Sequence, residues 1–250
     1  MARMVRLLEL LGGATRLSGQ TLVRMVTPPL ELSETMRQLD RVGVGSLNLT
    51  NITALFTGMV LALQIGHTLT AFGAKLYIGE VVAMALVREL GPVLTALMVG
   101  GRVGSGITAE LGSMAVTEQV DALRSMAADP VRKLVVPRVW ATLIALPLLT
   151  VLADAMGILG GMIIAVTQEG LTPTFYFSRA FRLMGFDDVA SGLGKTLFFA
   201  WLIAIIGCYN GINARGGADG VGRATTNTVF ASAIGVLVAD FFLTKLFLSL

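Results

Sequence analysis

Five stretches of the chain are long and apolar enough to cross the hydrocarbon core of a bilayer as helices. They cover about residues 47–72, 77–100, 139–166, 193–213 and 227–249. A core about 30 Å thick requires roughly 20 helical residues, and a helix satisfies its own backbone groups where no water can. The mean hydropathy of +0.77 lies outside the range of ordinary soluble domains. We therefore predict an all-α integral membrane protein with five spans.

The composition argues against soluble enzyme chemistry. Cys208 is the only cysteine and His67 the only histidine, so the chain can build neither an intrachain disulfide nor a Ser-His-Asp triad. The same shortage leaves no metal-ligand cluster. We expect no catalytic residue and no bound cofactor in this chain. The net charge of +3 is explained first by membrane topology, and we do not expect nucleic-acid binding.

Basic residues predict the orientation of the spans. Residues 1–46, 101–138 and 213–226 carry six, five and two Lys or Arg residues, against four in the connections 73–77 and 168–195. Because Lys and Arg concentrate on the cytoplasmic side of membrane proteins, we expect the amino terminus inside and the carboxyl terminus outside.

The first 46 residues are predicted to form interfacial and elbow helices ahead of the five-span domain at 47–250. The first 25 residues combine leucines with arginines, which is typical of an amphipathic helix lying in the membrane interface. The leucines are Leu7, Leu8, Leu10, Leu11 and Leu17, and the arginines are Arg3, Arg6, Arg16 and Arg24. Pro28-Pro29 is expected to end this helix, and Glu31 to Arg41 is predicted to form a short polar helix leading into the membrane.

Arg88 and Glu89 lie in the middle of the second predicted span, just before Gly91-Pro92. Each charge costs roughly 2.5–3.5 kcal/mol at that depth, so a function is the default hypothesis. Neighbouring helical residues point about 100° apart, so the two charges should find different partners. The candidate partners are Lys195, Asp240 and Asp154, and Pro92 permits a kink because it lacks an N–H.

A network of Arg88, Glu89, Lys195 and Asp240 would be electrically balanced. It could merely orient helices, or line a substrate path or couple conformational changes, or relay protons. Lys195 follows Gly194 in GKT, but a P-loop would need glycine where Val189 stands, so we do not predict a nucleotide site.

The longest connections hold two further predicted helices. In the inner one, Thr117 is a plausible N-cap of a short amphipathic helix and Pro130 disfavours helix at Asp129. The pattern alone favours a surface linker over a docking element for a partner. The outer connection at 168–191 should include a short helix around Thr174 to Leu183. Glycine pairs at spacing four, such as Gly207 and Gly211, predict close helix packing.

Three stretches together carry a resemblance to a known family: ALVRELGPVLTALMVGGRVGSGITAELGSM (85–114), TEQVDALRSMAADPVRKLVVPR (117–138) and GRATTNTVF (222–230). They resemble the MlaE/YrbE family, the permease subunits of Mla- and Mce-type ABC lipid transporters of the bacterial inner membrane. The resemblance implies a homodimer that moves phospholipid, or a related lipid, between that membrane and a periplasmic carrier, for outer-membrane lipid homeostasis. It also implies cytoplasmic ABC ATPase subunits that bind ATP and Mg, a small STAS-domain subunit and a periplasmic hexamer of MCE-domain subunits.

The resemblance also implies two sets of site residues. A lipid cavity would involve Arg88, Glu89, Leu90, Lys195 and Asp240, with Leu69 and Phe72 contacting acyl chains. The helix at about 117–128 would be the coupling helix that docks on the ATPase, through Glu118, Gln119, Asp121, Leu123 and Arg124, which reverses the preference for a linker. Asp154 has no charged counterpart in the family pattern, and its role stays open.

Two rival functions remain. A proton-coupled secondary transporter would use Glu89 and Asp240, and ideally would show an inverted repeat, which the sequence does not reveal. A structural membrane anchor for an ATPase would carry no lipid.

Overall fold

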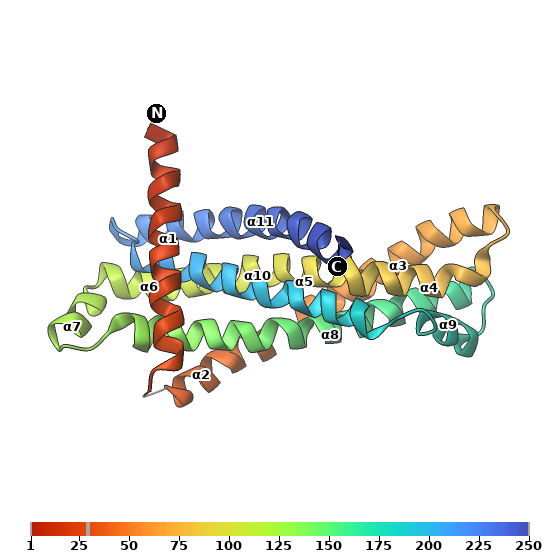
Figure 1. Cartoon of the computed structure of the whole chain (residues 1–250), viewed down its shortest axis with the longest axis horizontal. Coiled ribbons are helices and arrows are strands. Elements are labelled where there is room, and N and C mark those ends of the chain that lie inside the picture. The colour runs from red at the N-terminus through yellow and green to blue at the C-terminus, as the bar shows by residue number, and fades with distance from the viewer. Residues whose placement is uncertain (1, 29–30, 250) are drawn as a thin grey trace. The chain divides into compact units, whose positions relative to one another are not determined.

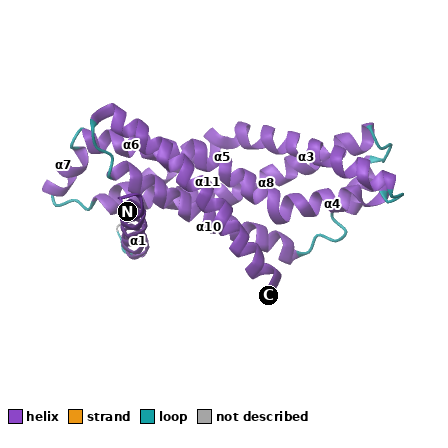
Figure 2. Ribbon diagram, turned by 90° about the horizontal axis from the view of Figure 1, so that it is seen from above, coloured by secondary structure: helices purple, strands orange, loops and turns teal. Residues whose placement is uncertain are grey.

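The computed structural model describes residues 2–28 and 31–249, without the side chains of residues 2–11 and Leu248. Within these residues Figure 2 shows helices joined by loops and no strand. The α-helices follow one another along the chain as Figure 1 colours them: α1 (Ala2–Val26), α2 (Leu32–Leu39), α3 (Gly45–Ala71), α4 (Ile78–Ala85), α5 (Gly91–Val99), α6 (Ser105–Val116), α7 (Gln119–Ser125), α8 (Val136–Thr167), α9 (Pro173–Ala180), α10 (Phe186–Ile212) and α11 (Gly217–Ser249).

Several of these helices join into longer ones that can span a membrane. In the described residues the helices long and apolar enough are Leu32–Ala71, Lys75–Val116, Val131–Thr167, Phe186–Ile212 and Gly217–Phe247. The predicted all-α, five-span fold is therefore confirmed. The first membrane-spanning helix begins at Leu32, earlier than expected, because the polar helix predicted at Glu31–Arg41 continues into the span without a break.

Wide π-helical turns make these junctions. They lie at Asp40–Val44 (η1), Leu86–Leu90 (η3), Gly100–Gly104 (η4) and Val131–Val135 (η5), whereas η2 (Lys75–Tyr77) is a tight 3₁₀ turn. The turn η3 lies just before Pro92, and the Gly91 N–H bonds to the Leu86 carbonyl across it. Because Pro92 has no N–H to donate, the helix widens at this point. Such turns are frequent at functional sites.

The chain divides into two compact units, and α8, α10 and α11 contribute residues to both. Unit 1 comprises the residues up to Val44 together with 99–145 and 199–238. Unit 2 comprises 45–98, 146–198 and the residues from Ala239 onward.

A buried polar contact joins α6, α10 and α11 within unit 1. The Thr108 hydroxyl lies 2.8 Å from that of Thr228 and 3.0 Å from the Gly207 carbonyl. A methyl group added to Gly211 would approach the Thr108 carbonyl to 3.1 Å, so α6 and α10 nearly touch backbone to backbone. The close packing predicted from the glycine spacing is confirmed here, and it provides contact where lipid offers no hydrophobic drive.

Unit 2 has an apolar core centred on α4 and α8. Tyr176 of α9 is fully buried in it, because Gly79 and Gly161 leave room for its backbone and ring. Burial raises the pKa of the Tyr176 hydroxyl. The helix predicted around Thr174 to Leu183 is present as α9, and the Thr172 side chain caps it by accepting from the Phe175 N–H at 3.4 Å. Tyr176 was not singled out in the sequence, although it anchors this helix.

The amino-terminal helix α1 is not among the helices that can span a membrane, and it ends at Val26, just before Pro28. The Trp201 indole N–H donates to the Ser18 hydroxyl at 3.0 Å, which joins α1 to α10. Figures 1 and 2 show α1 lying across the other helices of unit 1 and not parallel to them. The leucines and arginines of its first eleven residues lie outside the described side chains, as does Pro29: Arg3, Arg6, Leu7, Leu8, Leu10 and Leu11.

Candidate functional site

The ammonium group of Lys195 is the centre of a polar cluster in unit 2. The residue is 1% exposed on α10, within a membrane-spanning helix. Its Nζ lies 2.6 Å from Glu89 Oε2, 2.7 Å from the Thr244 hydroxyl and 3.4 Å from Asp240 Oδ1. A buried ammonium requires such neighbours, because an uncompensated charge there would cost several kcal/mol.

The backbone of the widened turn η3 supplies a further contact. Lys195 Nζ donates to the Arg88 carbonyl at 3.1 Å. That carbonyl lies four residues before Pro92, which has no N–H to offer it. Pro92 therefore leaves the Arg88 carbonyl without its usual helical donor, and the Lys195 ammonium group donates to that carbonyl instead. Thr244 completes the cluster, since its hydroxyl lies 3.1 Å from Glu89 Oε2.

Arg88 turns to a different neighbour, as helical periodicity predicted. Its Nε donates to Asp188 Oδ1 at 2.5 Å, and the Gly185 N–H donates to Asp188 Oδ2 at 2.8 Å. Asp188 is buried in the first turn of α10, where a carboxylate is favoured by the helix dipole. Asp188 was not predicted as a partner, because residues up to 191 were expected to lie in the outer connection. Two acids directly before an apolar span were the available signal.

These residues border a cavity of about 500 Å³, the usual size of a ligand pocket. Its lining includes two cations, Arg88 and Lys195, and three carboxylates, Glu89, Asp187 and Asp188. Thr244 and Phe247 also line it. The Arg88 side chain is 43% exposed, whereas that of Lys195 is 2% exposed. Arg88 is therefore the cation available to an anionic group, and Lys195 is already surrounded by protein.

Other predicted cavity residues lie elsewhere in the unit. Asp240 touches Lys195 but is not among the residues lining the cavity. Leu90 and Leu69 pack against the apolar core of unit 2, and Phe72 is 82% exposed. The structure therefore brings together Arg88, Glu89 and Lys195 at the cavity, with the two leucines and Phe72 apart from it.

Asp154 does not join this network. One of its carboxyl oxygens is buried without a hydrogen-bond partner in the described part of the chain. The same oxygen would lie 1.7 Å from a methyl group added to Gly91. Only glycine at position 91 leaves room for the Asp154 carboxyl group. This contact explains the glycine and assigns no function to Asp154.

The predicted coupling residues lie on and beside the short helix α7. Glu118, Gln119, Asp121 and Arg124 are exposed, Leu123 is half-buried, and Val120 is 3% exposed and attaches the helix to the protein. The prediction that Thr117 caps this helix was wrong. Thr117 ends α6 instead, and its hydroxyl donates to the Ser113 carbonyl at 2.8 Å. The next residue, Glu118, adopts a left-handed backbone conformation (φ 60°), and α7 begins only after it.

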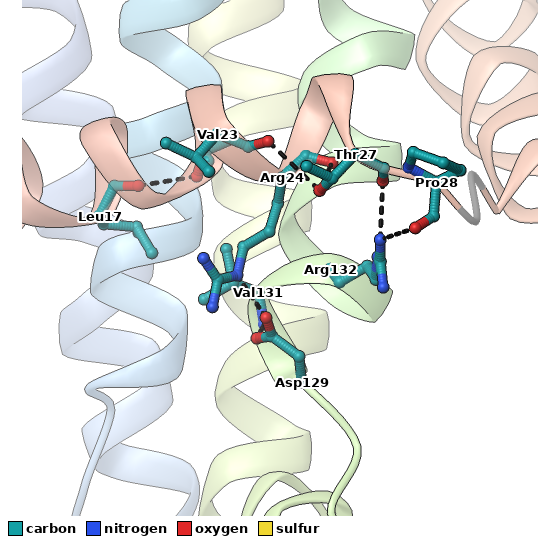
Figure 3. Close-up of polar contacts among 9 residues, drawn as sticks. Leu17, Val23, Arg24, Thr27, Pro28, Asp129, Val131 and Arg132 are labelled. Carbon is teal, nitrogen blue, oxygen red and sulfur yellow. Dashed lines mark hydrogen bonds and ion pairs between the residues drawn. The ribbon is translucent and has the colours of Figure 1, made fainter.

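The segment after α7 is tied to the end of α1. Figure 3 shows Arg24 reaching Asp129 in an ion pair, while Arg132 reaches back to the carbonyls of Thr27 and Pro28. Asp129 also accepts from the Val131 N–H at 3.0 Å. Burial alone would raise the pKa of Asp129, but the hydrogen bonds from Arg24 and the backbone outweigh it and lower this pKa below the usual range.

No group of three or more His, Cys, Asp or Glu side chains that could hold a metal ion is found among the described residues. The arrangement around Lys195 offers charge recognition and hydrogen bonding.

We predict that replacing Lys195 with methionine will destabilise the protein by about 3 kcal/mol, because Glu89 and Asp240 lose their compensating charge. Unfolding can be followed by the reaction of a thiol dye with Cys208, the single cysteine, which is buried. The double variant Lys195→Met/Glu89→Gln should recover part of the loss. Lys245→Met, on an exposed lysine of α11, is the matched control. Equal stability of Lys195→Met and this control would contradict a central role for the ammonium group.

We further predict that the attachment of α1 to Asp129 weakens in acid. Because the pKa of Asp129 is lower in the folded state, the attachment is complete above the unfolded value of about 4 and is lost as the pH falls through the folded value. Hydrogen exchange of amides 21–27, corrected for intrinsic rates, should show this loss. Asp129→Asn should lower protection at neutral pH and abolish its acid dependence, whereas Asp121→Asn should change neither. Identical protection in Asp129→Asn and the wild type would refute the attachment.

Comparison with known proteins identifies the family. Residues 35–246 match the family model described as permease MlaE. The chain is 42% identical to a probable ABC transporter permease protein of Rickettsia felis, over 98% of this chain and 95% of the relative. It is 40% identical to the intermembrane phospholipid transport system permease protein MlaE of Haemophilus influenzae, over 84% and 81%, and 37% identical to the protein trigalactosyldiacylglycerol 1 of Arabidopsis thaliana chloroplasts, over 92% and 66%. The protein, a multi-pass membrane chain, belongs to the MlaE family of ABC transporter permeases.

Proposed function

We propose that this permease moves phospholipid, or a related lipid, between the bacterial inner membrane and a periplasmic MCE-domain carrier. The observation that carries the proposal is a charged cavity among membrane-spanning helices in a chain of the MlaE family. The Haemophilus relative is named as an intermembrane phospholipid transport permease, which supports lipid as the cargo.

The cavity suits the head group of a phospholipid. The Arg88 side chain is 43% exposed, and its guanidinium pairs with Asp188 through Nε and one terminal nitrogen, so the other terminal nitrogen can donate to a phosphate oxygen. The carboxylates of Glu89 and Asp187 can meet a cationic amine, and Phe247 adds an apolar surface for the upper part of the acyl chains. Leu90, Leu69 and Phe72 would then contact lipid outside this cavity or at a subunit boundary.

Partner subunits would supply the energy for transport. Two cytoplasmic ABC ATPase subunits would bind ATP and Mg, a STAS-domain subunit would accompany them, and two copies of this chain would form the permease. A periplasmic MCE-domain hexamer would exchange the lipid. Residues 1–46, of which α1 lies across unit 1, would rest in the cytoplasmic interface. The domain at 47–250 would span the inner membrane, with 168–191 periplasmic and the carboxyl terminus outside.

The helix α7 is proposed as the coupling helix. Its exposed polar residues Glu118, Gln119, Asp121 and Arg124 would seat on the ATPase together with Leu123, while Val120 keeps the helix attached to the permease. Because the next segment is tied to the end of α1, motion at the ATPase would also reach the amino-terminal helix.

A direct test is lipid transfer by the complete complex in proteoliposomes. We expect transfer that requires ATP hydrolysis and lipid that co-purifies with the complex by mass spectrometry. Transfer driven by a pH gradient with an inactive ATPase would instead support a secondary transporter using Glu89 and Asp240. A complex without lipid and without transfer would support a structural anchor.

In the same assay we predict that Arg88→Gln or Glu89→Gln lowers transfer about tenfold, the effect of losing one hydrogen bond to a charged group. Arg182→Gln, on an exposed arginine outside the cavity, should retain wild-type transfer. If both cavity variants transfer lipid at the wild-type rate, the charges serve only helix packing.

Replacing Asp121 with asparagine, or Glu118 with glutamine, should weaken co-purification of the ATPase and leave the membrane subunit folded. Asp187→Asn is the matched control, since Asp187 lies on the opposite side of the membrane in the predicted topology. Retention of the ATPase by the Asp121 and Glu118 variants at the level of the control would remove the coupling assignment.

A further inference from the structure

The cavity beside Lys195 in unit 2 is lined by more carboxylates than cations. Arg88 and Lys195 face Glu89, Asp187 and Asp188. Lys195 Nζ lies 2.6 Å from Glu89 Oε2, and Arg88 pairs with Asp188. Asp187 is exposed and has neither an ion pair nor a side-chain hydrogen bond among the described residues. The lining therefore carries an excess negative charge, located on Asp187.

Glu89 can also accept from a ligand while it compensates the lysine. Asp240 Oδ1 lies 3.4 Å from Lys195 Nζ without lining the cavity, so two carboxylates share the compensation of this one ammonium group. The Glu89 side chain is 41% exposed. A carboxylate has about four lone-pair sites, so Glu89 retains accepting capacity toward the cavity.

The cavity offers few donors in return. The three N–H donors of the Lys195 ammonium group are used by Glu89, Thr244 and the Arg88 carbonyl. The Arg88 guanidinium pairs with Asp188 through Nε and one terminal nitrogen, which leaves the other terminal nitrogen for a ligand. A ligand that fits must therefore accept from Arg88 at one point and donate to carboxylates at another.

A head group with a phosphate and a primary ammonium group meets both requirements. The phosphate accepts from Arg88, and the ammonium group donates charge-assisted hydrogen bonds to Asp187 and Glu89, which are about twice as strong as neutral ones. A glycerol head group would bring hydroxyl donors but would leave the excess negative charge unbalanced. A trimethylammonium group would bring charge without N–H donors, and the described lining has a single aromatic side chain for it, Phe247.

We propose that this cavity selects lipids with a primary ammonium head group, such as phosphatidylethanolamine, over anionic and quaternary head groups, and that Asp187 determines the selectivity. Asp187 suits this role because no cation of the described chain requires it as a partner. That the ligand is a lipid rests on the proposed function. The head-group preference is a separate property, because it is measured at equilibrium and without transport.

The test is native mass spectrometry of the complete transporter complex, delipidated in detergent and titrated with phosphatidylethanolamine and phosphatidylglycerol that carry the same acyl chains. We expect the wild type to bind phosphatidylethanolamine about tenfold more tightly, the difference between a charged and a neutral hydrogen-bond donor. Equal affinity of the wild type for the two lipids overturns the proposal, and this comparison requires no variant to fold.

Variants of Asp187 test which residue is responsible. Asp187→Asn should reduce the preference to about threefold, because Glu89 alone remains to meet the ammonium group. Asp187→Lys should reverse the preference in favour of phosphatidylglycerol. Asp219→Asn is the matched control, since Asp219 is an equally exposed aspartate outside the cavity, in unit 1. A preference in both Asp187 variants equal to that of the control refutes the role of Asp187.

Methylation of the amine separates hydrogen bonding from charge. Phosphatidylethanolamine, its monomethyl and dimethyl derivatives and phosphatidylcholine carry the same charge with successively fewer N–H donors, so their affinity for the wild type should fall in this order. Equal affinity for the first and the last would overturn the assignment of a primary amine. Millimolar phosphoethanolamine, which lacks acyl chains, should not displace the lipid; displacement would identify a site for a soluble ligand and overturn the proposal.

Lipid transfer by the same complex keeps this proposal apart from the proposed function. ATP-dependent transfer by a complex that binds all head groups equally would refute the head-group assignment alone. A preference for phosphatidylethanolamine that depends on Asp187, in a complex that transfers no lipid, would support the head-group assignment and refute the proposed function.

Discussion

The buried ammonium group of Lys195 is the interaction on which the arrangement of unit 2 depends. It joins α10 to the turn η3 through Glu89 and the Arg88 carbonyl, and to α11 through Thr244 and Asp240. A charge at 1% exposure inside a membrane-spanning helix cannot be left without partners. The positions of Glu89 on the widened turn and of Asp240 and Thr244 on α11 are therefore explained by one requirement, the compensation of a single cation.

This compensation leaves Arg88 at the surface of a cavity. Because Asp188 is anchored by the Gly185 N–H and pairs with Arg88, the arginine is held in position while much of its side chain stays accessible. The same principle recurs in unit 1, where Glu110 compensates the buried Arg138 and also pairs with Arg41, whose side chain stays exposed. In both units a carboxylate neutralises a buried cation while a neighbouring arginine keeps much of its side chain accessible.

Much of the fold could be predicted because its signals are local. Apolar runs of about 20 residues define the five spans, and glycines at spacing four mark the contact between α6 and α10. The periodicity of a helix also separated the directions of Arg88 and Glu89. The local signals failed where backbone geometry departed from a regular helix: Glu118 reverses the chain, so Thr117 ends one helix and does not begin the next.

The sequence by itself determined that this is a five-span helical membrane protein, that its intramembrane charges need partners, and that Lys195 and Asp240 were available to supply them. Only the tertiary structure decided that Arg88 pairs with Asp188, that Phe72 lies apart from the cavity and that Glu110 is shared between two arginines. The physical reason is that hydrophobicity and helical period depend on neighbours along the chain. The partner of a buried charge, by contrast, depends on which helices meet at the same depth, and that is set by packing between segments a hundred residues apart.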